Sequence, residues 1–401
     1  MDNTIPFFDT DTHFAEPPSL WASRAPSKFK GKVLEVRKKP NGTESWFIGG
    51  HEVAMVGPAV IDKDMRRHYN VYSVPTFADI APAASSPRER LEFMDKFGVK
   101  AQVIYPNVIG FGAHKMMGIA PDDVELRLWH VQAYNDALVD LKNDGQGRLF
   151  PMAALPLWDI DASLKEIERI RKNGLTGVAL SDAPAHFGQP PLAHPAWDPL
   201  FATCQDLDLP INFHIGSGSF EGDFTPKWWG TDKTIINSDG TLQGPISAWA
   251  ASLAQLNNFV DIANLVLSGI CEKFPKLKFV SVESGCGWIP SAIQAIEHNW
   301  NEFKSPADRK RIKREPKEIF KDQIFVPYFF EGRNCVDAFL KEFGNDNLLF
   351  ETDFPHPSSI SEDVRERIEQ TLGHWDLETQ HKVLYKNAER LYGKVGGIQT
   401  H

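Results

Sequence analysis

The sequence has few cysteines and no long hydrophobic run. Four of its 401 residues are cysteine (Cys204, Cys271, Cys286 and Cys335), and none of them forms a Cys-X-X-Cys pair. This spacing excludes a dense disulfide framework and favours reduced thiols in the cytoplasm. Neither a signal peptide nor an apolar stretch of membrane-spanning length is visible. We therefore expect a cytoplasmic protein with no membrane partner.

The sequence also lacks a concentrated block of positive charge. Its formal net charge is -10, and most lysines and arginines alternate with acids. The one basic run, residues 304–317, is interrupted by Pro306, Glu315 and Pro316, which predicts a solvated connection. Nucleic acid is therefore not an expected partner, and a small-molecule substrate is.

Short apolar runs rich in Val, Ile, Leu and Phe recur along the chain, and a longer amphipathic stretch follows each of them. Most are continuous rather than alternating, as expected for strands that are covered on both faces. Eight strands are predicted, at residues 6–13, 99–105, 149–155, 175–180, 210–214, 276–283, 323–330 and 347–353.

Between the strands, apolar residues recur at intervals of three and four, which predicts helices. These lie at residues 87–97, 121–142, 160–172, 195–208, 247–272, 287–303 and 336–343. Eight strands that alternate with helices predict an α/β fold, a distorted (β/α)8 TIM barrel. With 42% hydrophobic residues the chain can bury a large core, and we expect residues 1–401 to form one domain.

Two insertions interrupt the barrel pattern. The first, at about 17–86, contains two β-like segments, 32–36 and 44–56, joined through Pro40, Asn41 and Gly42, which predicts a β-hairpin after the first strand. The second, at about 216–246, is a long loop rich in glycine and aromatic residues after the fifth strand, and we expect it to form a substrate wall or lid.

Acidic and histidine residues stand at the ends of several predicted strands. Asp11 and His13 end the first strand, His214 the fifth, Glu283 the sixth and Asp353 the eighth. Residues two apart in a strand face the same side, and the carboxyl ends of barrel strands converge at one face. Burying ionised carboxylates without a partner costs several kcal/mol. A divalent cation would remove that cost, so these residues predict a metal site.

Five segments resemble the amidohydrolase superfamily, and more narrowly its amidohydrolase-related (amidohydrolase 2) branch, which contains aminocarboxymuconate-semialdehyde decarboxylase. They are residues 9–17 (DTDTHFAEP), 213–218 (FHIGSG), 283–290 (ESGCGWIP), 351–357 (ETDFPHP) and 387–393 (NAERLYG). The resemblance runs from the first strand to the last helix. It implies a metal held by Asp11, His13, His214 and Asp353, with Asp11 in place of the family's first histidine.

The sixth strand departs from the branch's decarboxylases, which have a histidine where this chain has Glu283. Glu283 is either a metal ligand, as in the branch's carbon–carbon bond hydrolases, or a general base. Oxygen and imidazole ligands suit Zn²⁺, which we expect first, and also Mn²⁺ or Fe²⁺. One ion is favoured, although three carboxylates could hold two.

Three functions are open at this point. We expect first a metal-dependent hydrolase of a small apolar or aromatic carbonyl compound (an ester, thioester, amide or carbon–carbon bond). In that reaction Asp353 would accept a proton from metal-activated water, and His356 would protonate the leaving group or line the pocket. The alternative is a non-oxidative decarboxylase of an aromatic or unsaturated acid, and the third is an inactive ligand-binding barrel.

Other polar and aromatic residues near the strand ends are candidates for substrate binding. Arg333 could pair with a substrate carboxylate, although a salt bridge with a nearby acid is the simpler alternative. Glu16 is expected to hold a ligand in place rather than to touch the metal. The remaining candidates are His114, Trp228 and Trp288. A homodimer is the expected assembly.

Overall fold

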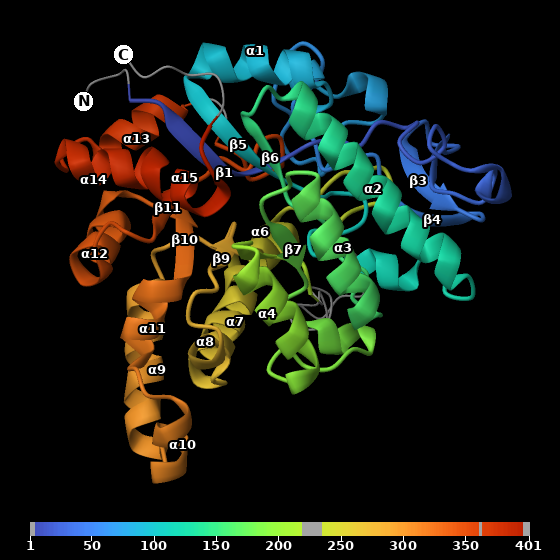
Figure 1. The fold of residues 1–401 in the computed structure, drawn as a ribbon. Coiled ribbons are helices and arrows are strands. Elements are labelled where there is room, and N and C mark those ends of the chain that lie inside the picture. The colour runs from blue at the N-terminus through green and yellow to red at the C-terminus, as the bar shows by residue number, and fades with distance from the viewer. Residues whose placement is uncertain (1–4, 219–234, 361–362, 396–401) are drawn as a thin grey trace.

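The computed structural model describes residues 5–218, 235–360 and 363–395 (Figure 1). Its main sheet has eight parallel strands in the order β6-β5-β1-β11-β10-β9-β8-β7. The two ends of this sheet meet at Ala153, which pairs with Val178 and closes the barrel. The strands are β1 (Phe7–His13), β5 (Val99–Tyr105), β6 (Leu149–Pro151), β7 (Val178–Leu180), β8 (Ile211–His214), β9 (Phe279–Val282), β10 (Ile324–Tyr328) and β11 (Leu348–Phe350). The predicted barrel is therefore confirmed.

Helices connect the strands and surround the sheet (Figure 1). Aspartate side chains cap three of them: the Asp123 carboxylate accepts from the Leu126 amide at 2.9 Å, the Asp159 carboxylate from the Ala162 amide at 3.0 Å, and the Asp376 carboxylate from the Thr379 amide at 2.9 Å. The helices are α1 (Pro87–Phe97), α2 (Val124–Asp144), α3 (Ile160–Lys172), α4 (Asp198–Asp206), α6 (Pro245–Leu253), α7 (Gln255–Leu267), α8 (Ile270–Lys273), α9 (Ile289–Phe303), α10 (Pro306–Arg311), α11 (Pro316–Gln323), α12 (Arg333–Phe343), α13 (Val364–Leu372), α14 (Leu377–His381) and α15 (Asn387–Tyr392).

Several strands are shorter than predicted because side chains take over their backbone hydrogen bonds. The strand predicted at 149–155 ends at Pro151, since the backbone of Ala154 pairs with the Asn135 amide at 2.9 and 3.0 Å. The strand predicted at 347–353 ends at Phe350, and the Thr352 amide donates to the Asp9 carboxylate at 2.8 Å. Hydrophobic runs do not reveal such partners.

Two predicted helical regions also differ from the structure. The single helix expected at 247–272 is three helices, α6, α7 and α8. Gly269, which has a φ of 87°, separates α7 from α8. The solvated connection expected at 304–317 contains α10 and the start of α11. Ser305 caps α10, and its hydroxyl accepts from the Asp308 amide at 3.2 Å.

The insertion after β1 is larger than the predicted hairpin. It forms a three-stranded antiparallel sheet of β2 (Glu35–Lys38), β3 (Glu44–Ile48) and β4 (His51–Met55). The turn between β3 and β4 lies at Gly49 and Gly50, whose φ angles of 55° and 97° favour glycine. Both later strands lie within the single segment 44–56, so the apolar pattern hid this turn.

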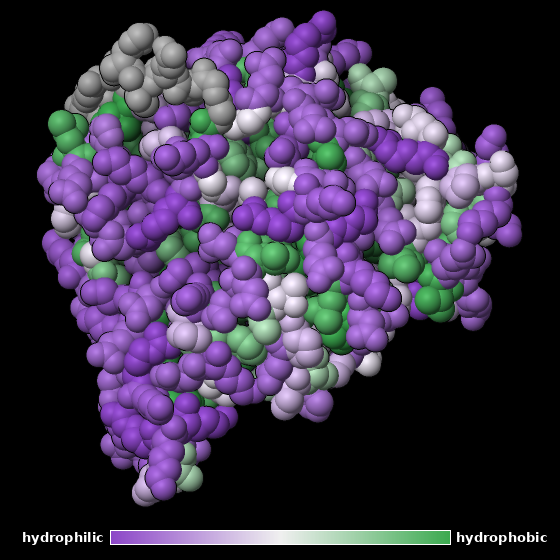
Figure 2. Space-filling model, viewed as in Figure 1, coloured by the Kyte–Doolittle hydropathy of each residue, from purple (hydrophilic) through white to green (hydrophobic). Residues whose placement is uncertain are grey.

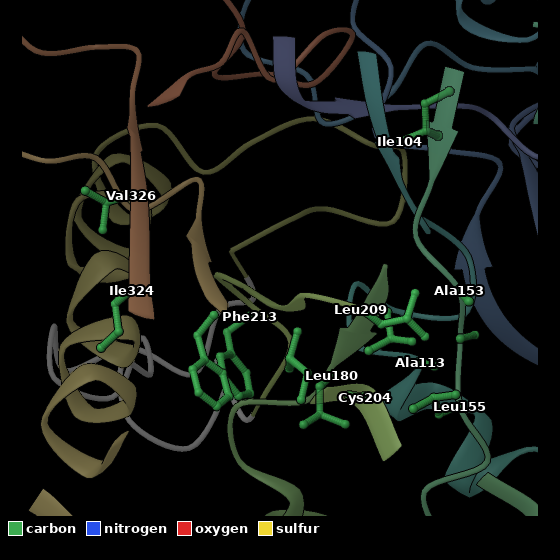
Figure 3. Close-up of a cluster of buried hydrophobic side chains, with 14 of the residues drawn as sticks. Ile104, Ala113, Ala153, Leu155, Leu180, Cys204, Leu209, Phe213, Ile324 and Val326 are labelled. Carbon is green, nitrogen blue, oxygen red and sulfur yellow. The ribbon is translucent and has the colours of Figure 1, made fainter. Parts of the chain in front are cut away.

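The core has three parts, one on each side of the barrel wall and a third formed mainly by residues of the first insertion. Side chains such as Ile104, Leu180 and Val326 pack outward against the helices (Figure 3). Inside the barrel, Phe8 and Val280 pack with residues of α15. There the hydroxyls of Tyr105 and Tyr392 both donate to the Asn212 side-chain oxygen, at 3.0 and 2.7 Å. The barrel is therefore filled from below, which leaves its strand ends for the site.

Polar residues dominate the face shown in Figure 2, and apolar residues form small separate areas on it. The polar area at the lower left includes α10, which lies at the tip of the arm formed with α9 and α11 (Figure 1). Within the described residues, no helix has the length and hydropathy needed to cross a bilayer.

Candidate metal centre

Strand β1 brings Asp11 and His13 into the barrel interior. Both side chains are fully buried, and Asp11 Oδ1 lies 3.5 Å from His13 Nε2. The chain leaving β11 pairs with this strand end: the Asp353 amide donates to the Asp11 carbonyl at 2.9 Å, and the His13 amide donates to the Phe354 carbonyl at 2.8 Å. The first and last strands thus join their polar residues at one site.

His214, the last residue of β8, faces the same site. Its Nε2 lies 3.2 Å from His13 Nε2 and 3.5 Å from Asp11 Oδ1. Its Nδ1 lies 2.7 Å from the Ile215 carbonyl, which can only accept, so the proton belongs on Nδ1. The Nε2 lone pair is therefore directed at the cluster, as a metal ligand requires.

Glu283 directly follows β9, Asp353 lies three residues after the end of β11, and both have left-handed backbones, with φ angles of 56° and 57°. Glu283 Oε2 lies 3.6 Å from His214 Nε2, and Asp353 Oδ1 lies 3.5 Å from His13 Nε2. A left-handed conformation costs a non-glycine residue about 1–3 kcal/mol and is typical of functional sites. The backbone here turns each carboxylate into the cluster.

The five residues fit a divalent ion. Ligand atoms of Asp11, His13 and His214 lie within 4.8 Å of one another, and so do those of Asp11, Glu283 and Asp353. Both carboxylate oxygens of Asp11 are buried without a hydrogen-bond partner. A cation would satisfy these oxygens, since buried carboxylates are otherwise paired or hydrogen-bonded.

The electrostatics of the site act in opposite directions on its two histidines and set its acids against one another. Burial, followed by the charges of His356 and His214, lowers the pKa of His13 well below 6.5. Burial alone lowers the pKa of His214, but Asp11 and then Glu283 outweigh it, and the pKa is raised. Burial first, and neighbouring carboxylates second, raise the pKa of Glu283 and of Asp353 well above the usual range. A bound cation would offset this repulsion.

His356 lies inside the cluster. Its ring stacks on the ring of His13 with centroids 3.5 Å apart, and its Nδ1 lies 2.8 Å from Asp353 Oδ1. Its Nε2 lies 2.9 Å from Asn107 Oδ1, and Asn107 Nδ2 donates to the Phe14 carbonyl at 3.1 Å. His356 could therefore complete a ligand group with His13 and Asp353.

Glu16 supports this arrangement from below without touching the clustered ligands. Its Oε1 accepts from the Asn107 and Val108 amides at 2.9 and 3.1 Å, which fixes the segment whose side chain holds His356. This placement agrees with a role in positioning. Burial raises the pKa of Glu16 from 4.5 to about 7.

The substitution Glu16→Gln should make folding stability less sensitive to pH. Between pH 4.5 and about 7 the folded state binds the Glu16 proton more tightly than the unfolded state, so stability falls as pH rises. The full difference corresponds to about 3 kcal/mol, and glutamine keeps the accepting oxygen. The free energy of unfolding of both proteins would be measured by urea unfolding at about pH 5 and at about pH 8. The variant minus wild-type difference in this free energy should be more positive at the higher pH. An equal difference at both pH values would contradict the prediction.

Sequence reasoning missed several residues that lie around the cluster. The Phe111 ring lies 4.3 Å from the His214 ring and 5.1 Å from the His13 ring. The Ser358 hydroxyl donates to Glu283 Oε1 at 3.0 Å and is hydrogen-bonded to Asp353 Oδ2. Ser358 follows Asp353 by five residues in the same segment, a signal that could have revealed it.

Two further missed residues, Glu351 and Tyr72, lie beside the charged groups of the site. Glu351 is fully buried, and its Oε2 accepts from the Glu283 amide at 3.3 Å. Burial, with Glu283 and Asp353 nearby, raises the pKa of Tyr72 to about 12. Tyr72 belongs to the first insertion and Gly240 to the second insertion. The Tyr72 amide donates to the Gly240 carbonyl at 2.7 Å. The two insertions therefore meet beside the site.

The predicted substrate-binding residues lie apart from these ligands. Arg333 begins α12, and its side chain is 55% exposed. Its Nε lies 3.9 Å from Asp337, which agrees with the alternative of a salt bridge with a nearby acid. His114 stacks on Phe187 and lines a cavity of about 880 Å³ beside the three-stranded sheet. Trp288 packs on Phe259 and donates to the Ser284 carbonyl. Trp228 lies outside the described residues, and all four roles stay predictions.

A protein-family model described as amidohydrolase matches residues 8–394. Among curated proteins, γ-resorcylate decarboxylase from Rhizobium sp. (strain MTP-10005) is 27% identical over 276 residues. The match covers 66% of this chain and 76% of that protein. The γ-resorcylate decarboxylase of Rhodococcus jostii (strain RHA1) is 26% identical over 275 residues, with the same two shares covered.

Solved structures share the fold at low sequence identity. An amidohydrolase from Mycobacterium avium subsp. paratuberculosis K-10 superposes with a TM-score of 0.74 at 18% identity, over 97% of this chain and 99% of that one. A 5-carboxyvanillate decarboxylase from Novosphingobium aromaticivorans, solved with bound manganese, has a TM-score of 0.65 at 16% identity, over 97% of each chain.

Proposed function

This chain belongs to the amidohydrolase family, and from that premise we propose that it is a metal-dependent decarboxylase of an aromatic carboxylic acid. The observation that carries the proposal is the buried group Asp11, His13, His214 and Asp353, which offers two imidazoles and two carboxylates to one cation. Relatives that match two thirds of the chain are named as decarboxylases of an aromatic acid, which supports decarboxylation over hydrolysis.

We propose one divalent ion per chain, held by Asp11, His13, His214 and Asp353. Manganese is favoured, because a structurally similar decarboxylase was solved with it and because the two carboxylates of the donor set are ligands that suit it. The Zn²⁺ expected from the sequence is the alternative. When bound, the ion supplies positive charge that stabilises negative charge on the substrate oxygens during the reaction.

The protein's own residues would bind the ring and deliver a proton. The bond between the ring carbon and the carboxyl carbon breaks, CO2 leaves, and the electron pair stays on the ring carbon, which then takes up one proton. Phe111 lies across the rings of His13 and His214 and would exclude water from the face of an aromatic substrate. Glu283 Oε2 borders His214 and is the proposed proton donor.

Hydrolysis is the second candidate, and Glu283 is the observation that favours it. Glu283 lies as close to His214 as Asp11 does, at 3.6 and 3.5 Å between the nearest atoms. A carboxylate in this place could take a proton from an attacking water, and Asp353 could orient that water. The substrate would then be an ester, thioester, amide or carbon–carbon bond next to a carbonyl.

Isotope labelling distinguishes the two reactions. The Mn²⁺-loaded protein would be incubated with hydroxylated benzoic acids in D2O, and with their esters in H2¹⁸O, and the products analysed by mass spectrometry. We expect CO2 release and one deuterium on the ring carbon that carried the carboxyl group. Incorporation of ¹⁸O from the water into the acid released from the esters, without CO2 release from the acids, would instead establish hydrolysis. Chelation should abolish either reaction.

A further inference from the structure

The first insertion contacts the loop that follows Asp353. The Val60 amide donates to the Pro355 carbonyl at 3.1 Å. Arg67 reaches further along the same loop: its Nη2 donates to the Pro357 carbonyl at 2.6 Å, and its Nη1 donates to the carbonyl of Ser359 and, at 3.2 Å, to its hydroxyl. One guanidinium therefore binds the carbonyls on both sides of Ser358.

Ser358 links two carboxylates of the candidate metal centre. Its hydroxyl contacts Glu283 Oε1 at 3.0 Å and Asp353 Oδ2, and these acids follow different strands, β9 and β11. The two acids repel each other when both are ionised. The Ser358 hydroxyl has one proton, so it donates to one of these carboxyl groups and accepts from the other when that one is protonated. Its two contacts hold the inner oxygens at a set separation, while Glu283 Oε2 and Asp353 Oδ1 face the histidines.

The two arginines at the centre of the first insertion differ in what they bind. Arg66 pairs with Asp62 and Asp64 within its own turn, and its side chain is 70% exposed. Arg67 is directed at the loop of Ser358, almost 300 residues away in sequence. A planar guanidinium can bind two carbonyls at once, which a lysine ammonium cannot do with the same geometry.

We propose that Arg67 is a positioning residue: by binding the carbonyls of Pro357 and Ser359, it holds the Ser358 hydroxyl between Glu283 and Asp353 and so sets the geometry of the metal ligands. The inference rests on the metal centre of the proposed function but not on the reaction that the enzyme catalyses. Residues that orient metal ligands typically contribute about 10- to 100-fold to metal affinity. The first insertion is then part of the site.

The test is a calorimetric titration of Mn²⁺ into the chelator-treated protein, which measures the Mn²⁺ affinity. Unfolding temperatures are recorded in parallel. Arg67→Met and Ser358→Ala should each weaken Mn²⁺ binding by about 10- to 100-fold. Ser358→Thr keeps the hydroxyl and should recover most of the affinity, and Arg67→Lys should recover little. Arg66→Met removes the same charge one residue away and should bind Mn²⁺ like wild type.

A double-mutant cycle shows whether Arg67 acts through Ser358. The protein with both Arg67→Met and Ser358→Ala should bind Mn²⁺ about as well as the protein with Ser358→Ala alone, because the second loss removes nothing further. Fully additive losses, or an Arg67→Met protein that unfolds earlier but binds Mn²⁺ like wild type, would overturn the inference and leave the proposed function intact. Wild-type protein that binds no Mn²⁺ would overturn both.

Discussion

Replacement of His214 by alanine is expected to remove most of the bound divalent ion and nearly all activity while leaving the barrel folded. His214 Nε2 is a proposed metal-ligand atom and lies 3.2 Å from His13 Nε2 and 3.5 Å from Asp11 Oδ1. Structural Zn²⁺ in zinc-finger peptides binds with about 10–16 kcal/mol, and on that scale one of four ligands supplies about 3 kcal/mol, or a factor of about 100 in affinity. Elemental analysis of protein purified without chelator measures the content, and His13→Ala should behave in the same way.

The matched control is His114→Ala. His114 is a partly buried imidazole in the connection after β5, but it stacks on Phe187 rather than on the clustered ligands. This variant should keep the metal content of wild type, and circular dichroism should show an unchanged fold for all three proteins. Full metal content in both His13→Ala and His214→Ala would remove these residues from the ligand set.

Replacement of Glu283 by glutamine should separate proton transfer from metal binding. Glu283 lies beside His214, and Ser358 and the Glu351 carboxylate hold it from the other side. Glutamine keeps the size and an accepting oxygen but cannot carry the transferred proton. We expect turnover to fall by about 10²- to 10⁴-fold, the usual contribution of a general acid or base, with metal content retained.

Parallel measurement of metal content and turnover makes this prediction decisive. A Glu283→Gln protein that loses its metal together with its activity would make Glu283 a ligand, and a content falling from about two ions to one would establish a second metal. Glu283→His provides a second comparison, because the branch that the sequence resembles has a histidine in this place among its decarboxylases. Under the proposed function this variant should retain part of the activity that glutamine abolishes.

The strand positions could be predicted because barrel strands are covered on both faces and therefore read as apolar runs. Some of their ends could be predicted as well, such as the bounds 99–105 of β5, but others could not. Asn135 and Asp9 bind backbone groups of Ala154 and Thr352 that would otherwise continue a ladder, and these partners are distant in sequence. The segment 44–56, predicted as one β-like stretch, is two strands separated by a turn at Gly49 and Gly50.

The polar ends of the strands indicated which residues meet, since parallel barrel strands place their carboxyl ends at one face. Asp11, His13, His214, Glu283 and Asp353 were therefore accessible to sequence reasoning. The same reasoning left Arg333 with two roles: the sequence shows a cation after the seventh strand, and in the structure α12 begins at that residue, whose Nε lies 3.9 Å from Asp337 on the same helix, so the substrate-binding role stays a prediction.

The sequence by itself determined the barrel, its eight strands and the polar residues that end them, because periodicity and strand ends are local features of the chain. The tertiary structure alone decided which side chains surround that group. Phe111 lies across the histidines, Ser358 lies between Glu283 and Asp353, and Arg67 holds the loop of Ser358. These contacts join loops and insertions whose folding depends on the assembled barrel, so no local pattern in the sequence specifies them.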